Sequence, residues 1–430
     1  VELEGALSGG ATGKDVILAL CGLYPDDVLN AAVEFAGPGV ASLSMDSRMA
    51  IANMTTEWGA LAGWFPVDRV TLDWARARIA RGVRGSGPSD LASWEKDPPR
   101  PDPGASYALR IRLDLSEVVP HVAGPDAVQI ATPLPEIEAK GIAIRKAYLV
   151  SCVNSRLEDL EAAARVLEGR KVAEGVSFYV AAASKEIQEE AERRGAWKTL
   201  LDAGATPLPP SCGPCIGLGA GLLEAGEVGI SATNRNFKGR MGSRDAKCYL
   251  ASPEVVAASA VAGRIAGPRE TASRRPGRRI EILAPPAPAA EKVAILDGFP
   301  ARVRGRLVFA PQDNLNTDGI YGKDYTYRED MTREDMARVV MENYDPEFAK
   351  RTAAGDVLVG GFNFGTGSSR EQAVTALQAK GIPLVVAGSF SQTYLRNAFN
   401  NGFLCIEVPD LVRRLWEIFA PELAAKTRTV

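Results

Sequence analysis

Short apolar runs alternate with amphipathic runs through most of this sequence. In the middle of the chain "AYLVSC" leads into "SRLEDLEAAARVLEGRK", and "VSFYVAAAS" leads into "SKEIQEEAERRG". Later "DVLVGGFNFG" leads into "SSREQAVTALQAKG" in the same way. A strand pattern followed by a helix pattern is typical of βαβ units around a mainly parallel sheet. The alternation therefore predicts an α/β fold, in which ligand sites lie at the carboxyl ends of the strands.

Two proline-rich stretches divide the chain, because proline interrupts both helices and sheet ladders. They are "WEKDPPRPDPGAS" and "RRPGRRIEILAPPAPAAEK". In the first piece we expect one helix over "GKDVILALCGL" and a second that begins near Asp46 and ends at Gly63. The predicted domains are 1–93, 107–270 and 298–430, with 271–297 as a linker.

The composition excludes several classes of protein. The net charge of −3 gives no reason to expect a nucleic-acid partner. We find no apolar run near the 18 residues that a membrane span needs. Six cysteines in 430 residues are too few for a disulfide scaffold and favour a reducing compartment. The chain has one histidine, His121, for which we expect a structural role.

Three cysteines share a polar context at predicted strand ends. Cys152, Cys212 and Cys215 form the pattern C-x59-C-x2-C, which suggests three thiolates at one sheet edge. A redox dithiol would not need Cys152, and a closed zinc site takes four protein ligands. An iron–sulfur cluster with one open iron and a set of structural thiols remain as alternatives. The other cysteines are expected to be packing residues: Cys21, Cys248 and Cys405.

Two further segments carry polar groups that suit anion chemistry. The stretch "SATNRNFKGRMGS" places Arg235 and Arg240 on a loop, and forked guanidinium groups bind carboxylates well. Surface charge is the ordinary alternative for such a pair. Asn53 and Glu57 lie four apart on one predicted helix face, where simple surface polarity is again the alternative.

The stretch "GGFNFGTGSSREQAV" is the last of these signals. Gly365 and Gly367 would let the backbone approach a ligand closely. Ser368 is expected to cap the following helix, and in a functional interpretation it acts as a base. Two nucleotide motifs are excluded, since "GTGSSR" lacks a third glycine and "GGATGKD" has Asp15 where a phosphate loop needs Ser or Thr.

Together these segments resemble the aconitase superfamily, from near Val1 to about Leu411. "SCVNSR", "SCGPCIGLGAG" and "YLASPEVVAASAVAGRI" are similar to its cluster domain, and "FNFGTGSSREQA" to its mobile swivel domain. "NMTTEWGALAGWFPVD" and "QDNLNTDGIYGKDYTY" most resemble the fungal homoaconitase subfamily. The resemblance implies aconitase-like three-layer α/β/α domains plus a C-terminal swivelling β/α domain.

The resemblance also implies a role for each matching residue. Three thiolates would ligate a 4Fe-4S cluster: Cys152, Cys212 and Cys215. Two amides would lie beside it: Asn53 and Asn234. Substrate carboxylates would be held by Arg235, Arg240, Ser369 and Arg370. Catalytic roles would fall to Ser368 as the base, to Glu57 in orienting a histidine, and to Asp313. The side chain of the substrate would be selected by Lys323 and Tyr325.

The activity implied is a hydro-lyase that interconverts homocitrate and homoisocitrate through cis-homoaconitate in lysine biosynthesis. Isopropylmalate isomerase is the enzymatic alternative, and a non-catalytic RNA-binding relative is the alternative from another class. We expect a monomer of the mitochondrial matrix, an expectation that rests on the family and not on a targeting peptide. We also expect the chain alone to be an inactive C-terminal portion whose cluster site can be empty, because the family's catalytic histidines precede Val1.

Overall fold

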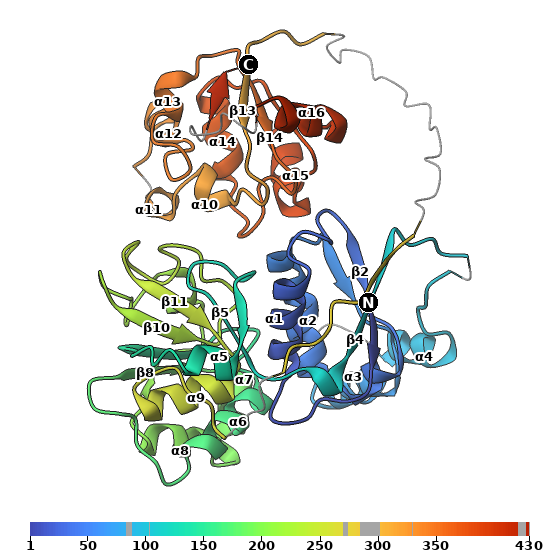
Figure 1. The fold of residues 1–430 in the computed structure, drawn as a ribbon, viewed down its shortest axis with the longest axis vertical. Coiled ribbons are helices and arrows are strands. Elements are labelled where there is room, and N and C mark those ends of the chain that lie inside the picture. Colours follow the sequence, from blue (N-terminus) through green and yellow to red (C-terminus); the bar gives the residue numbers. More distant parts are fainter. Residues whose placement is uncertain are drawn as a thin grey trace. The chain divides into compact units, whose positions relative to one another are not determined.

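The computed structural model describes residues 1–82, 88–102, 104–269, 274–283, 302–328, 330–419 and 427–429. Contacts divide the chain into two compact units. The first comprises Val1–Asp27, Val33–Trp58 and Ala62–Pro286, and the second Val28–Ala32, Gly59–Leu61 and Ala287–Val430. Of the predicted linker 271–297, residues 271–273 and 284–297 lie outside the described residues. Figure 1 shows the elements of each unit, and each unit is an α/β structure, as predicted.

The first unit begins with a small sheet and four helices. Its three-stranded sheet has the order β1-β4-β12, with β1 parallel and β12 antiparallel to β4. The strands are β1 (Glu2–Glu4), β4 (Leu109–Asp114) and β12 (Ile280–Ile282). The helices are α1 (Gly13–Leu23), α2 (Met45–Trp58), α3 (Arg69–Ala80) and α4 (Pro88–Lys96). A separate two-stranded sheet pairs β2 (Ala32–Glu34) with β3 (Ala62–Trp64).

Of the two helices predicted for this region, one is confirmed and the predicted end of the other is wrong. The helix over Gly13–Leu23 is confirmed residue for residue. The next helix was expected to reach Gly63, and that expectation is wrong, since α2 ends at Trp58. Gly59 has a φ of 99°, which no helical residue adopts, and the chain then enters β3.

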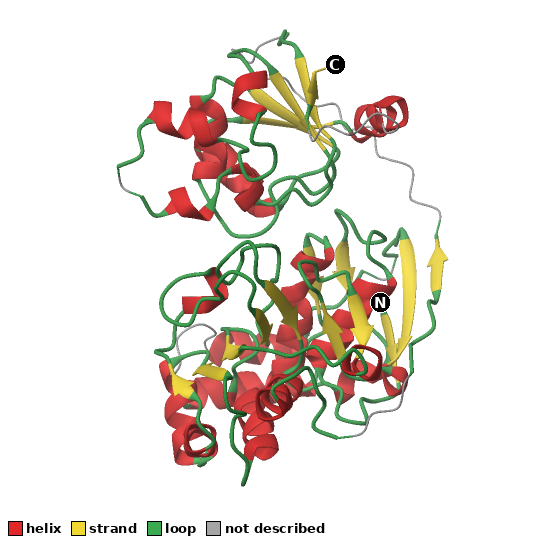
Figure 2. Cartoon of the chain, turned by 60° about the vertical axis from the view of Figure 1, so that its left-hand side comes forward, coloured by secondary structure: helices red, strands yellow, loops and turns green. Residues whose placement is uncertain are grey.

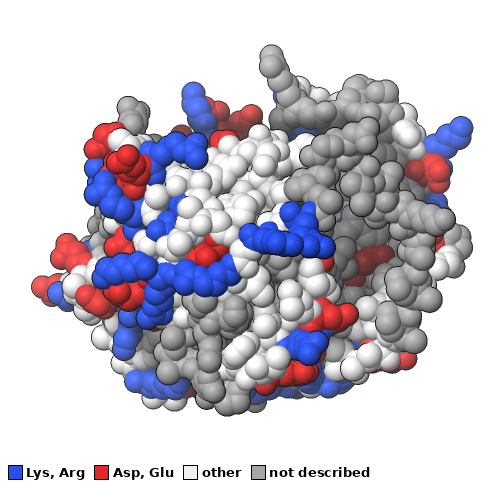
Figure 3. Space-filling view, turned by 90° about the horizontal axis from the view of Figure 1, so that it is seen from above, with Lys and Arg blue, Asp and Glu red and all other residues white. Residues whose placement is uncertain are grey.

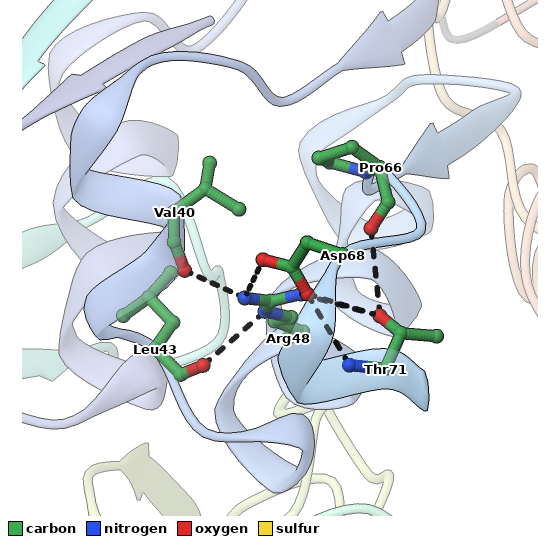
Figure 4. Close-up of polar contacts among 6 residues, drawn as sticks. All are labelled: Val40, Leu43, Arg48, Pro66, Asp68 and Thr71. Carbon is green, nitrogen blue, oxygen red and sulfur yellow. Dashed lines mark hydrogen bonds and ion pairs between the residues drawn. The ribbon is translucent and has the colours of Figure 1, made fainter. Parts of the chain in front are cut away.

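A buried ion pair fixes the start of α2 against α3. The Arg48 guanidinium is 1% exposed and donates to both carboxylate oxygens of Asp68, each over 2.7 Å (Figure 4). It also donates to the carbonyls of Val40 and Leu43, over 2.9 and 3.2 Å. Asp68 in turn accepts from Thr71 N and caps α3. One side chain thus joins two helices and the loop before α2.

The larger sheet of the first unit has seven strands in the order β6-β5-β11-β10-β7-β8-β9. The five strands from β11 to β9 are parallel, while β5 and β6 run antiparallel at one edge. The strands are β5 (His121–Ala123), β6 (Ala131–Pro133), β7 (Lys146–Val150), β8 (Ser177–Ala181), β9 (Thr206–Pro207), β10 (Val228–Ser231) and β11 (Lys247–Leu250). After β7 the chain therefore adds β8 and β9 on one side of that strand. It then crosses back and adds β10 and β11 on the other side.

Helices cover one face of this sheet and loops cover the other (Figure 2). On β7, Ala147 and Leu149 pack into the core beneath the helices, and Tyr148 and Val150 face a smaller cluster beneath the loops. The helices are α5 (Leu134–Glu138), α6 (Leu157–Leu167), α7 (Lys185–Arg193), α8 (Ala196–Asp202) and α9 (Pro253–Ala262).

The second unit is a five-stranded sheet with helices on both faces (Figure 2). Its order is β16-β15-β14-β13-β17, in which only β17 is antiparallel. The strands are β13 (Leu307–Ala310), β14 (Val357–Gly360), β15 (Leu384–Ala387), β16 (Leu404–Glu407) and β17 (Arg428–Thr429). The helices are α10 (Thr317–Ile320), α11 (Lys323–Thr326), α12 (Arg333–Val339), α13 (Phe348–Arg351), α14 (Gln372–Ala379), α15 (Gln392–Asn400) and α16 (Pro409–Phe419). No helix in the described part of the chain has the length and apolar character needed to cross a membrane.

Candidate functional site

The polar loops of the first unit meet where its strand order reverses. β7 and β10 are adjacent parallel strands, but the chain leaves them in opposite directions along the sheet. Loops at such a switch point diverge and leave a crevice, which is the usual ligand position in α/β proteins. The loop after β7 carries Cys152, and the loop after β10 carries Asn234 and Arg235.

The thiols of Cys152, Cys212 and Cys215 are free, and Cys215 lies within electrostatic range of the other two. Cys152 and Cys212 are exposed, and Cys215 is half-buried. Burial raises the pKa of Cys215, Arg240 opposes the rise, and the Cys152 and Cys212 thiols add to it. In the described part of the chain no group of three or more His, Cys, Asp or Glu side chains is arranged to hold a single metal ion. An iron–sulfur cluster needs less exact convergence of its ligands than a single metal ion does. Each thiolate binds its own iron, so the sulfurs need not converge on one point.

The turn that carries Cys212 and Cys215 is held from two sides. It is the 3-10 helix η3 (Gly213–Ile216), and Arg240 Nε donates to the carbonyl of Cys215 over 2.7 Å. Tyr148, on β7, donates its hydroxyl to the carbonyl of Gly221 over 2.6 Å. The turn is therefore tied both to the arginine loop and to the strand that leads to Cys152. Cys21 and Cys248 are buried, and burial raises the pKa of each thiol, that of Cys248 to about 12.

One face of α2 meets the loop after β10. Asn234 Nδ2 donates to Asn53 Oδ1 over 2.5 Å, and Arg235 Nε donates to Glu57 Oε1 over 2.5 Å. Two residues four apart on a helix thus bind two consecutive residues of a loop. Within the described residues, Glu57 Oε2 and Asn234 Oδ1 are buried and accept no hydrogen bond. Buried acceptors are normally paired, so this site has room for further donors.

Sequence reasoning missed Lys14, which lies beneath these loops. The sequence drew attention to this region only through its failed phosphate-loop motif. Lys14 is 1% exposed and donates to the carbonyl of Thr233 over 2.7 Å. The available signal was the apolar character of the surrounding helix, in which every residue from Gly13 to Cys21 is buried. A charged residue inside such a helix has to be buried with it.

In the second unit, the loops after β13 and β14 bind each other. Asp313 Oδ1 accepts from Phe362 N over 2.6 Å, and Asn363 Nδ2 donates to Asn314 Oδ1 over 2.8 Å. Asp313 therefore joins the two loops at the carboxyl ends of adjacent parallel strands.

Ser369 and Arg370, predicted to bind carboxylates, and Ser368, predicted to be the base, follow in the second of these loops. Arg370 is 8% exposed and donates through Nη1 to Asp318 Oδ1 and to the carbonyl of Tyr321, over 2.8 and 2.7 Å. Ser369 Oγ lies 3.3 Å from Asn397 Nδ2. The expected capping role of Ser368 is wrong, because α14 begins at Gln372, four positions further on.

The predicted selectivity segment is the short helix α11. Lys323 N donates to Asp318 Oδ1 over 2.9 Å, which fixes the start of this helix. The hydroxyl of Tyr325 donates to Glu342 Oε2 over 2.9 Å, and this contact raises the pKa of the tyrosine. Tyr325 and Arg328 line a cavity of about 300 Å³. The segment therefore borders an open space next to the residues around Arg370.

His121 has a structural explanation. It is buried in β5, and its Nδ1 lies 2.6 Å from the carbonyl of Val119. Burial lowers its pKa to about 4, so the ring is neutral at ordinary pH.

Two family models match the chain. Residues 1–263 match the aconitase family (aconitate hydratase), and residues 287–411 match the aconitase C-terminal domain. A solved structure of 3-isopropylmalate dehydratase from Methanocaldococcus jannaschii is 40% identical, covering 24% of this chain and 59% of that chain, with a TM-score of 0.22.

Curated relatives match over nearly the whole chain. The mitochondrial homoaconitase of Eremothecium gossypii is 55% identical over 100% of this chain, and that of Yarrowia lipolytica is 53% identical over 100%. That of Mycosarcoma maydis is 54% identical over 97%. The chain spans 63 to 65% of the length of these relatives. The chain belongs to the aconitase family.

Proposed function

We propose that the chain belongs to a homoaconitate hydratase of the mitochondrial matrix, a hydro-lyase of lysine biosynthesis. The reaction would interconvert homocitrate and homoisocitrate through cis-homoaconitate. The observation that carries the proposal is the meeting of Asn53 and Glu57 with Asn234 and Arg235 at the switch point where Cys152 also lies. The identity with proteins named mitochondrial homoaconitases supports the choice of substrate and compartment.

Cys152, Cys212 and Cys215 would hold a 4Fe-4S cluster. Three free thiols, with Cys215 in electrostatic range of the other two, fit such a group, because iron–sulfur clusters are bound by cysteine thiolates. Three ligands leave one iron open, and a bound cluster would supply a Lewis acid for loss of the substrate hydroxyl. Asn53 and Asn234 would lie at its edge, joined by their own hydrogen bond.

In the first unit, Arg235 and Arg240 would bind substrate carboxylates. Contacts already orient each guanidinium, among them that of Arg235 with Glu57 and that of Arg240 with the Cys215 carbonyl. Preoriented guanidinium groups lose less entropy when they bind a carboxylate. Glu57 Oε2 would accept from a catalytic histidine, since it is buried and unpaired within the described residues.

In the second unit, Ser369 and Arg370 would hold a further carboxylate, and Ser368 Oγ would remove the α-proton. A cation near a serine hydroxyl favours its deprotonated form, and Arg370 lies two positions from Ser368. Lys323 and Tyr325 would contact the side chain that distinguishes homocitrate from shorter tricarboxylates.

A small acidic substrate fits the charge of the protein better than RNA does. The net charge is −3, and Figure 3 shows Lys and Arg interspersed with Asp and Glu on the face that it draws. Nucleic acids are attracted by basic patches or stripes. A salt-dependent RNA gel shift would favour the non-catalytic alternative.

The proposal is tested by anaerobic reconstitution of the chain with iron and sulfide. We expect four irons for each chain and an EPR signal after reduction that changes when homocitrate is added. Cys212→Ser should lose the signal, while Cys405→Ser, in the other unit, should keep it. A signal that survives Cys212→Ser would refute the ligand assignment. A response to 3-isopropylmalate without a response to homocitrate would assign the chain to the isomerase instead.

A further inference from the structure

Lys14 is a fully buried cation held by neutral groups. Its Nζ lies 2.7 Å from the Thr233 carbonyl, 3.2 Å from Asn154 Oδ1 and 3.2 Å from Met54 Sδ. The Ala232 carbonyl lies at 3.4 Å. Within the described residues Lys14 forms no ion pair with a carboxylate.

The groups that Lys14 contacts belong to three separate segments, and each segment carries a predicted site residue. The contacts lie within two positions of Asn53 on α2, Cys152 after β7 and Asn234 after β10. These segments are far apart in the sequence and come together around the Lys14 ammonium. A single ammonium therefore bridges the helix face, the cysteine loop and the arginine loop.

Stability alone does not explain a lysine at this position. Burying a charge costs several kcal/mol unless a counter-charge or very good hydrogen bonds offset it. Burial lowers the pKa of Lys14 to about 8, with Glu57 as the largest opposing influence. A methionine would fill the same space and avoid this cost. An ammonium has an advantage only through its three donors, which can bind acceptors in several segments at once.

We infer that Lys14 is a positioning residue of the proposed hydratase site, and that its ammonium sets the placement of the loops that carry Cys152 and Asn234 relative to α2. The inference rests on the proposed function, because that function gives these loops their purpose. The contacts of Lys14 themselves do not depend on it. Lys14 is not a catalytic residue, because the groups around it are those of the chain itself.

The test is Lys14→Met, with Lys146→Met as the matched control. Lys146 is also a buried lysine of the first unit, but it lies at the opposite end of β7 from Cys152 and pairs with Glu227 over 2.6 Å. Hydrogen exchange of the backbone amides is measured on the whole chain without metal. We expect exchange in 151–155 and 231–236 to become about ten- to a hundredfold faster in Lys14→Met, the effect of losing a charged hydrogen bond.

A lysine that only fills space would not produce this local pattern. If exchange in these two segments stays as in the unaltered chain, or rises no more than in Lys146→Met, the inference is wrong. Asn154→Leu provides a second variant, should Lys14→Met fail to fold. It removes one acceptor of Lys14 and is expected to speed exchange in 151–155 more than in 231–236. An equal increase of exchange in both segments of Asn154→Leu would also contradict the inference.

The EPR spectrum of the reconstituted chain separates this inference from the proposed function. We expect Lys14→Met to change the shape of the signal and Lys146→Met to leave it unchanged. If the unaltered chain takes up no iron, the proposed function fails, and the hydrogen-exchange result still decides whether Lys14 positions the loops.

Discussion

Arg370 and Asp318 form a buried ion pair, with guanidinium and carboxylate 2.8 Å apart and their side chains 8% and 10% exposed. The same carboxylate accepts from Lys323 N, at the start of α11, and from Asn343 Nδ2. One acidic side chain thus orients the arginine proposed to bind substrate and also fixes the segment proposed to select it.

Asp318→Asn is expected to lower the free energy of unfolding of the second unit by about 1.5–3 kcal/mol, because a charged hydrogen bond in a buried position becomes a neutral one. Hydrogen exchange of the second unit's amides in increasing denaturant measures the change. Asp330→Asn is the control, since Asp330 also pairs with an arginine but is 70% exposed, and its loss should cost less than about 1 kcal/mol. Equal effects of the two substitutions would show that the buried pair with Arg370 stabilises the unit no more than the exposed pair does.

Arg48→Met is expected to destabilise the first unit by about 2–4 kcal/mol. It removes the partner of Asp68 and a hydrogen-bond donor to the carbonyls of Val40 and Leu43, of which that of Val40 still accepts from Leu43 N. Thermal unfolding of the variant measures the loss. Arg76→Met removes an exposed arginine that also binds two carboxylates and should change the melting temperature little.

The Arg48–Asp68 pair also predicts a loss of stability in acid. Burial alone would raise the pKa of Asp68, but the hydrogen bonds from Arg48 and Thr71 N bring it below its usual value. The unfolded carboxyl therefore binds protons first, and the stabilisation is complete above about pH 4 and is lost as the pH falls below that. In Asp68→Asn the decline in melting temperature below about pH 4 should be shallower. An unchanged acid slope would argue against this linkage.

Asp159 predicts a pH dependence of the opposite sign at higher pH. Burial raises its pKa to about 7, and the hydrogen bond from Arg156 N only partly opposes the rise. The folded protein then binds a proton that the unfolded chain releases above about pH 4, so stability falls as the pH rises from about 4 to 7. Asp159→Asn keeps an acceptor for Arg156 N and should flatten this slope. A melting-temperature profile that is unaltered by the substitution would contradict the raised pKa.

Gly365 gives a prediction about the loop that leads to Ser368. A Cβ added at Gly365 would lie 2.3 Å from the ring of Tyr394, and φ is 77°. Gly365→Ala is therefore expected to cost about 2–4 kcal/mol, from overpacking and from the left-handed backbone together. Gly402→Ala is the control, since φ is 60° but no atom lies within 4 Å of the added Cβ. It should cost only about 1–2 kcal/mol, and equal costs would rule out the contact with Tyr394.

Local sequence signals predicted much of the fold. α1 follows from an unbroken apolar pattern, and each strand–helix pair of the alternation was found, because both patterns are set by neighbours in the chain. The errors lie at boundaries. α2 stops at Gly59, where backbone geometry decides, and Ser368 lies before the helix that it was expected to cap.

The contacts of the candidate site could not be predicted in the same way. The hydrogen bond between Asn53 and Asn234 joins residues 181 positions apart, and the contact from Lys14 to Thr233 spans 219. No periodicity specifies such pairs, since they depend on which strands become neighbours. The contact of Gly365 with Tyr394, whose atoms lie nearest to an added Cβ, was likewise not predicted from the sequence.

The strand order of the seven-stranded sheet has a consequence for the order of assembly. Cys152 and Cys212 lie on loops separated by a helix, a strand, two further helices and a second strand, so the two loops come to one edge of the sheet only after several non-local strand pairs have formed. The core that brings them together consists of apolar side chains and contains none of the three thiols. We therefore expect this domain to fold without metal, unlike a zinc finger, in which the metal drives folding.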